Sequence, residues 1–273
     1  MTATTRQKNG ANTNSLLYPA NMSLDDAQLL RYSRHVLLPD VGIEGQERIA
    51  AASVLVVGAG GLGCPAALYL GASGVGRLVV ADGDVVELTN LQRQIGHAHN
   101  SIGENKAVSL ARSVRAINPE IEVVAIESRL HGAALSEAVR RADIVVDASD
   151  NFATRHAINR ACFESGKPLV SGSALGFSGQ LAVFDPKQAS SPCYHCLFPD
   201  QDDDAPSCSE AGILSPLVGV IGAAQAMETL KWLAQSGQTL TGRLLLWDGL
   251  ASEMRVLKVP RDTGCSVCGG RGK

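Results

Sequence analysis

Apolar runs and helix-like stretches alternate along the first part of the chain. Four runs rich in valine, isoleucine and leucine predict strands at 53–57, 77–82, 121–126 and 142–147. Apolar residues recur at helical spacing over 104–117 and 152–165, and these stretches stop at Asn118 and Gly166. Strands and helices that alternate at this spacing predict a parallel sheet with right-handed crossovers.

The pattern changes beyond residue 167. Four further apolar runs lack regular helices between them, at 169–172, 179–184, 242–247 and 254–259. They predict added strands that are partly antiparallel. One long helix interrupts them: Ser215 and Pro216 open it, and 217–234 is apolar almost all round, which predicts a buried helix. We therefore expect an α/β fold, with a Rossmann-like parallel sheet extended by partly antiparallel strands.

Three segments stand apart from this core. Residues 1–22 are polar and without apolar period, and we interpret them as a flexible tail. Ser23 is a suitable N-cap for a helix that runs to Arg34. An acidic loop at 198–212 has few apolar residues and is expected to be mobile. The remaining chain, 23–273, predicts a single domain.

Composition excludes several classes of partner. The chain has 273 residues, a net charge of −3 and 4% aromatic residues, which provides neither a basic surface nor a stacking platform for nucleic acid. No uninterrupted apolar run reaches the roughly 18 residues of a membrane span, so no membrane partner is predicted. The N-terminus lacks the apolar core of a signal peptide, so we expect a cytoplasmic protein, where clustered thiols more often hold metal.

The first motif with chemistry is a glycine-rich loop after the strand at 53–57. Gly58, Gly60 and Gly63 match the pattern G-x-G-x-x-G, in which backbone N–H groups and a helix N-terminus approach phosphate. Asp82 ends the next strand, where a carboxylate can bind a ribose hydroxyl. Taken alone, this pattern equally fits an NAD-dependent oxidoreductase.

Three charged residues follow at strand ends near this loop. Arg93 and Lys106 are suitable to neutralise a triphosphate, and Asp150 follows the strand at 142–147, where it could hold Mg²⁺. Each residue by itself could also be an ordinary solvated charge. His97 and His99 are isolated in sequence, and we expect both at the surface.

Two CxxC pairs lie in the second half of the chain, at Cys193/Cys196 and Cys265/Cys268. Four thiolates can close a tetrahedral zinc site, which would act as a structural staple between distant segments. Two disulfides or a redox pair are the alternatives, and His195 could replace one cysteine as a ligand. Cys64 and Cys162 lie in apolar helical stretches and are expected to be small core residues.

The motifs together resemble those of the ubiquitin-activating-like adenylyltransferases, above all the molybdopterin-synthase adenylyltransferases and their thiamine-pathway relatives. The resemblance covers about 23–270 and rests on the glycine-rich loop, the cysteine pairs and the segments 31–34, 82–84, 91–94, 103–106 and 147–151. It implies a homodimer that uses ATP and Mg²⁺ to adenylylate the C-terminal Gly-Gly carboxylate of a small ubiquitin-fold sulfur-carrier protein, releasing pyrophosphate. It also implies a nucleotide-binding part at 53–166 and a carrier-binding and zinc part at 167–273.

The resemblance also assigns residues. It places a set at ATP or its metal: Gly58, Gly60, Gly61, Gly63, Asp82, Thr89, Asn90, Leu91, Gln92, Arg93, Lys106, Asp150 and Asn151. Arg34 matches a position that reaches the neighbouring subunit's ATP, and with Arg93, Lys106 and Asp150 it forms the expected catalytic set. Cys208 matches a loop cysteine that some relatives use for sulfur or thioester chemistry and others carry without needing it, so both interpretations stay open.

Two other function classes remain: an NAD-dependent oxidoreductase with structural zinc, and a non-catalytic activating-enzyme-like scaffold. No rhodanese-like extension follows Lys273, so we expect the sulfur donor to be a separate protein. Molybdopterin, thiamine and related sulfur-transfer pathways are equally compatible with the motifs.

Overall fold

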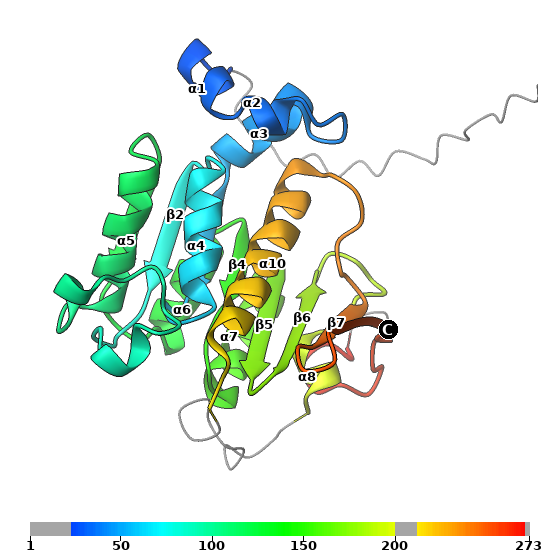
Figure 1. The fold of residues 1–273 in the computed structure, drawn as a ribbon. Coiled ribbons are helices and arrows are strands. Elements are labelled where there is room, and N and C mark those ends of the chain that lie inside the picture. Colours follow the sequence, from blue (N-terminus) through cyan, green and yellow to red (C-terminus); the bar gives the residue numbers. More distant parts are fainter. Residues whose placement is uncertain (1–22, 200–211, 271–273) are drawn as a thin grey trace, which may run out of the picture.

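A computed structural model describes residues 23–199 and 212–270 of the chain. The predicted tail at 1–22 and the segment 200–211, which carries most of the acidic loop and Cys208, lie outside the described residues. A mixed sheet of eight strands forms the centre of the molecule, in the order β3-β2-β1-β4-β5-β6-β7-β8 (Figure 1). This arrangement confirms the predicted fold class.

The sheet has a parallel half and an antiparallel half. The strands are β1 (Ser53–Val57), β2 (Arg77–Ala81), β3 (Glu122–Ile126), β4 (Ile144–Asp147), β5 (Leu169–Leu175), β6 (Ser178–Phe184), β7 (Arg243–Asp248) and β8 (Glu253–Lys258). The first five pair in parallel, and β6, β7 and β8 add to β5 as antiparallel neighbours. β1 and β4 are almost completely buried, which matches their continuous apolar runs.

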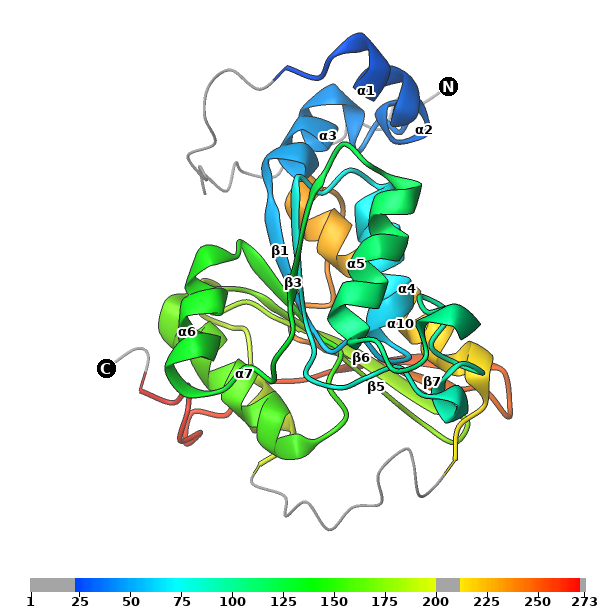
Figure 2. The same cartoon turned by 90° about the vertical axis from the view of Figure 1, so that its left-hand side faces the viewer.

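Helices cover both faces of the sheet. The longer ones are α3 (Gly42–Ala51), α4 (Gly63–Ala72), α5 (Lys106–Ile117), α6 (Gly132–Arg141), α7 (Phe152–Ser165) and α10 (Ser215–Ala234). α4, α5 and α10 lie on one side of the sheet and α6 and α7 on the other (Figure 2). The short ones are α1 (Asp26–Arg31), α2 (Ser33–Val36), α8 (Tyr194–Leu197) and the 3-10 turns Leu88–Asn90 and His99–Ser101.

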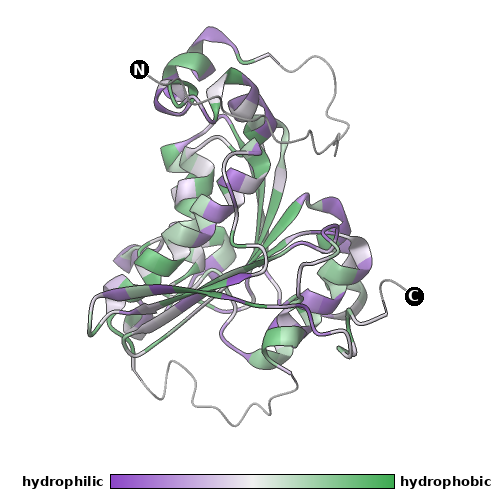
Figure 3. Cartoon of the chain, turned by 90° about the vertical axis from the view of Figure 1, so that its right-hand side faces the viewer, coloured by the Kyte–Doolittle hydropathy of each residue, from purple (hydrophilic) through white to green (hydrophobic). Residues whose placement is uncertain are grey.

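Each face of the sheet has its own apolar core. Ile221 and Leu233 of α10 and Leu70 of α4 are buried against one face, and Ile158 of α7 against the other. Figure 3, a ribbon coloured by hydropathy, shows hydrophobic residues along the strands of the sheet. Within the described ranges, no helix is both long enough and apolar enough to cross a membrane.

Three sequence-based expectations need correction at the level of elements. Asp25, not Ser23, caps the first helix: its carboxylate accepts the N–H of Gln28 at 2.8 Å, and Gln28 returns a bond to the Asp25 N–H. That helix ends at Arg31, and a second short one carries Arg34. α3 and α6 were not predicted, because α3 buries one large apolar side chain, Ile49, and α6 only two.

Candidate functional site

A cleft opens at the carboxyl ends of β1, β2 and β4, where a ligand site is expected in a sheet of this kind. It brings together eight residues singled out from the sequence: Gly58, Gly60, Gly61, Asp82, Arg93, Lys106, Asp150 and Asn151. Ala174, Ile213 and Val218 contribute an apolar stretch of the wall from the second half of the chain. The cleft is therefore lined by both charged and apolar side chains.

The glycine-rich loop is packed tightly where β1 passes into α4. Gly58 has φ +101°, and a Cβ there would lie 2.6 Å from the Ala148 carbonyl oxygen. A Cβ on Gly63 would lie 1.9 Å from the Gly58 carbonyl oxygen. These two glycines are therefore required by the fold itself. A Cβ on Gly60 would meet only Gln94 Nε2, at 3.5 Å, so the protein alone does not require glycine there.

Acidic and basic side chains alternate along the β2 end of the cleft. Asp82 accepts the Ala59 N–H at 2.7 Å and the Asp84 N–H at 2.8 Å. Asp84 pairs with Arg129 at 2.7 Å and with Lys106 Nζ at 3.5 Å. The hydrogen bond from Arg129 lowers the pKa of the Asp84 carboxyl, so this carboxylate stays ionised.

Lys106 is held in place by the start of α5. Its side chain is only 10% exposed. The preceding Asn105 caps the helix by accepting the N–H groups of Ala107 and Val108, and its amide donates to the carbonyl oxygens of Asp82 and Asp84. One residue thus ties the helix, the strand end and the lysine into one rigid unit.

At the β4 end of the cleft, buried polar residues hold the loop that carries the exposed residues Asp150 and Asn151. Asp147 accepts hydrogen bonds from Ser149 and Ser171, and burial raises the pKa of its carboxyl. Asp150 is exposed in the cleft wall, and Asn151 caps α7 through the Thr154 N–H at 2.9 Å. Arg155 is buried and donates to the Ser149 carbonyl at 3.0 Å, so it braces the loop that carries Asp150.

The structure does not place every predicted site residue in the cleft. Thr89, Asn90, Leu91 and Gln92 lie on the turn that leads to Arg93, whose guanidinium donates to the Thr89 carbonyl at 3.2 Å. Arg34 is exposed on α2, which packs against α3 at the amino ends of the strands, at the opposite end of this chain from the cleft (Figure 1). The binding roles of these residues stay predictions.

Sequence reasoning missed several side chains of the site. Arg129 and Arg155 carried no spacing signal, and Asp84 was part of the motif at 82–84 without a role of its own. The expectation that His97 lies at the surface is wrong. His97 is buried beneath the glycine-rich loop, where Nε2 lies 2.9 Å from the Ala59 carbonyl oxygen and Nδ1 lies 3.0 Å from Ser109 Oγ. Its partners are distant in sequence, so no local pattern reveals them.

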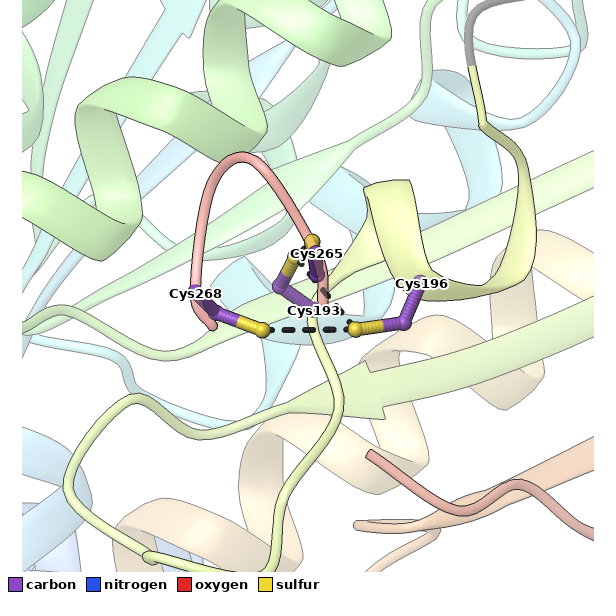
Figure 4. Close-up of side chains that lie close together, drawn as sticks. All are labelled: Cys193, Cys196, Cys265 and Cys268. Carbon is purple, nitrogen blue, oxygen red and sulfur yellow. Dashed lines mark hydrogen bonds between the residues drawn. The ribbon is translucent and has the colours of Figure 1, made fainter. Parts of the chain in front are cut away.

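The four paired cysteines form a second site, away from the cleft. Their sulfurs all lie within 4.8 Å of one another and point toward a common centre (Figure 4). Three of the distances are 3.9 Å for Cys193–Cys196, 3.7 Å for Cys193–Cys265 and 3.3 Å for Cys196–Cys268. Four sulfurs placed about 2.3 Å from one zinc ion would be about 3.8 Å apart, so the set fits tetrahedral zinc.

The surroundings of the cysteines also suit a metal. The described cysteines are all free, which argues against the disulfide alternative. Burial raises the pKa of the Cys193 and Cys268 thiols, whereas at Cys265 hydrogen bonds from the backbone of Cys268 and Val267 outweigh burial and lower the pKa to about 7. His195 Nδ1 lies 3.5 Å from the Cys265 sulfur, so His195 supports a ligand rather than replacing one. Cys64 and Cys162 are buried elsewhere, as expected.

Comparison with known proteins gives consistent relatives. Residues 32–267 match the ThiF family. The chain is 45% identical to the sulfur carrier protein ThiS adenylyltransferase of Escherichia coli (strain K12), over 90% of this chain and 98% of that protein. It is 45% identical to the SAMP-activating enzyme E1 of Haloferax volcanii, over 92% and 93% of the two chains. It is 43% identical to the adenylyltransferase and sulfurtransferase MOCS3 of Dictyostelium discoideum, over 93% of this chain but 60% of that protein's length.

Solved structures support the fold. The structure of E. coli MccB with MccA-N7isoASN superposes with a TM-score of 0.78, covering 89% of this chain and 75% of that one at 22% sequence identity. The structure of E. coli MccB with ATP gives a TM-score of 0.77 at 23% identity, with 88% and 75% coverage. At this level of identity the likeness concerns the fold alone.

Proposed function

The chain belongs to the ThiF family, and from that premise we propose that it uses ATP to adenylylate the C-terminal glycine carboxylate of a small ubiquitin-fold sulfur-carrier protein. The products are an acyl-adenylate on the carrier and pyrophosphate. Related proteins named adenylyltransferases, with 43–48% sequence identity, support the reaction class. Molybdopterin, thiamine and related sulfur-transfer pathways would each supply a carrier of this type.

The observation that carries the proposal is the charge arrangement of the cleft. A glycine-rich loop at the start of α4 faces two cations, Arg93 and Lys106, and the acidic residues Asp82 and Asp150. An oxidoreductase that binds a dinucleotide would require the loop and Asp82, but not two further cations and Asp150 at the same wall. An enzyme that binds a triphosphate would require all of them, because the negative charge of the triphosphate must be offset while its α-phosphorus is attacked.

The chemistry follows from positions rather than from an acid or a base. The carrier's terminal carboxylate is ionised at neutral pH, so no general base is required. A carboxylate oxygen forms a bond to the α-phosphorus as the bond from that phosphorus to the bridging oxygen breaks, and pyrophosphate leaves with the electron pair. We propose that Arg93 and Lys106 neutralise the charge that develops on pyrophosphate and that Asp82 binds a ribose hydroxyl.

The remaining sites have supporting roles. Asp150 is the exposed carboxylate of the cleft that would hold Mg²⁺, and this ion would offset phosphate charge. Cys193, Cys196, Cys265 and Cys268 would hold structural Zn²⁺. We keep the division into a nucleotide-binding part at 53–166 and a carrier-binding and zinc part at 167–273, and we assign the apolar cleft wall of the second part to the carrier's tail.

The test is ATP–pyrophosphate exchange. We expect exchange that requires both Mg²⁺ and a carrier ending in Gly-Gly, with molybdopterin-type and thiamine-type carriers assayed side by side. Asp150→Ala should be inactive, whereas Glu164→Ala, which removes an exposed carboxylate at the far end of α7, the helix that follows Asp150, should behave as wild type. Full exchange by Asp150→Ala would remove the metal assignment. Tight binding of NAD without binding of ATP would overturn the proposed function.

A further inference from the structure

The hydrogen bonds of the glycine-rich loop leave several backbone donors for a ligand, and the N–H groups of Gly60 and Gly61 are among them. The Gly58 N–H donates to the Ala81 carbonyl at 2.9 Å, and the Gly60 carbonyl accepts the Cys64 N–H at 2.9 Å. No atom of the described ranges, 23–199 and 212–270, accepts the N–H of Gly60 or Gly61. Both glycines line the cleft. Both residues are only partly buried, so these two N–H groups are accessible from the cleft and available to an acceptor on a ligand.

His97 binds the same loop from below. A carbonyl oxygen can only accept, so the 2.9 Å contact with the Ala59 oxygen requires that Nε2 carries the hydrogen. Nδ1 is then the acceptor for the Ser109 hydroxyl at 3.0 Å. Ser109 belongs to α5, the helix that also begins with Lys106. The Ala59 carbonyl thus sets the tautomer of His97, and α5 supplies the partner of the other ring nitrogen.

Peptide geometry connects His97 with the cleft. The carbonyl and the N–H of a planar trans peptide point in opposite directions. The carbonyl of the peptide between Ala59 and Gly60 is held toward buried His97, so its N–H, that of Gly60, points away from His97 toward the cleft. The preceding N–H, that of Ala59, is held by Asp82 at 2.7 Å. Both peptide planes that flank Ala59 are therefore fixed.

We propose that His97 is a positioning residue, which holds the Ala59 carbonyl so that the Gly60 N–H stays aimed at a phosphate oxygen of the bound nucleotide. The inference rests on the proposed function, because it takes a nucleotide as the ligand. A donor held in place before binding needs no reorganisation when the phosphate arrives. Without His97 the Ala59 carbonyl loses its main partner, and rotation of the peptide would turn a carbonyl oxygen toward the phosphate.

Two variants of His97 with similar side-chain volumes test whether the N–H donor, rather than the size of the side chain, is required. Glutamine and methionine both approximate histidine in size, but only glutamine keeps an N–H near the position of Nε2. We expect His97→Gln to keep most of the ATP affinity and His97→Met to lose about tenfold, the upper range for one hydrogen bond. His99→Met, at an exposed position two residues away, is the control. Binding of ATP-Mg²⁺ is measured by titration calorimetry and folding by thermal unfolding.

Exchange kinetics add a readout that a purely structural role would not move. His97→Met should raise the KM for ATP while leaving the KM for the carrier unchanged. Wild-type protein that binds no ATP would overturn the proposed function together with this inference. Wild-type protein that binds ATP, with His97→Met binding equally well, would overturn the positioning role alone.

A measurement on the wild-type chain covers the case in which His97→Met does not fold. Nitrogen-15 NMR of the His97 ring distinguishes the two neutral tautomers. We expect hydrogen on Nε2 and a bare Nδ1. Hydrogen on Nδ1 alone would exclude the bond to Ala59 and overturn the proposal.

Discussion

At the scale of single residues, Gly58, Gly60 and Gly63 have different roles, although all three belong to the pattern G-x-G-x-x-G. Gly58 and Gly63 are required by the chain itself, since added methyl groups would lie 2.6 Å and 1.9 Å from backbone oxygen atoms. Gly60 has only a side-chain nitrogen of Gln94 at 3.5 Å. The absence of a side chain at Gly60 therefore serves whatever occupies the cleft.

This difference predicts that Gly60→Ala separates binding from folding. The variant should unfold within a few degrees of wild type, because no backbone clash or positive φ opposes alanine there. Its ATP affinity should fall at least about tenfold, because a methyl group occupies the approach to the Gly60 and Gly61 N–H groups. Calorimetric titration and thermal unfolding measure the two effects.

Gly63→Ala is the matched comparison and should lose stability, by about 2 kcal/mol or more, from overpacking against the Gly58 carbonyl. A Gly60→Ala chain that binds ATP as tightly as wild type would show that phosphate does not approach this part of the loop.

At the scale of elements, the sequence pattern predicted helices whose ends are set by residues close to them in the chain. α7 was predicted with its observed bounds, because Asn151 caps its start and Gly166, at φ +66°, ends it. α3 and α6 were missed, because each buries only one or two large apolar side chains and so gives a weak helical pattern. The place of His97 could not be predicted, because its contacts join the loop at Ala59 to α5 and exist only in the folded chain.

The predicted zinc staple also belongs to this scale, since its cysteines bring α8 together with a segment some seventy residues later in the chain. We expect one zinc per chain in reduced protein, lost in Cys268→Ser and kept in Cys162→Ala, whose cysteine is outside the cluster. Chelation should loosen 193–196 and 265–268 before the nucleotide-binding part, because metal binding and local folding are coupled. Metal analysis and hydrogen exchange give the two readouts; zinc retained by Cys268→Ser would contradict the ligand set.

At the scale of the whole molecule, the described chain leaves large apolar side chains exposed. Leu30, Leu37, Ile43, Tyr69 and Met227 are each at least 50% exposed, and they belong to α1, the turn after α2, α3, α4 and α10. Large exposed apolar side chains are common at protein–protein interfaces. It is compatible with the predicted homodimer, which would also explain why Arg34 lies far from the cleft of its own chain.

The predicted homodimer implies complementation between two inactive variants. If Arg34 reaches the partner's nucleotide, each site combines Asp150 of one chain with Arg34 of the other. Arg34→Ala alone should lose on the order of 10³-fold, with arginine fingers as the guide. A heterodimer of Arg34→Ala with Asp150→Ala then has one intact site and one site lacking both groups. Random exchange of subunits makes half the dimers mixed, so activity should return to about a quarter of wild type.

If mixed dimers form, as native mass spectrometry can show, yet ATP–pyrophosphate exchange stays absent, Arg34 acts within its own chain. If Arg34→Ala alone is fully active, Arg34 is an ordinary solvated side chain.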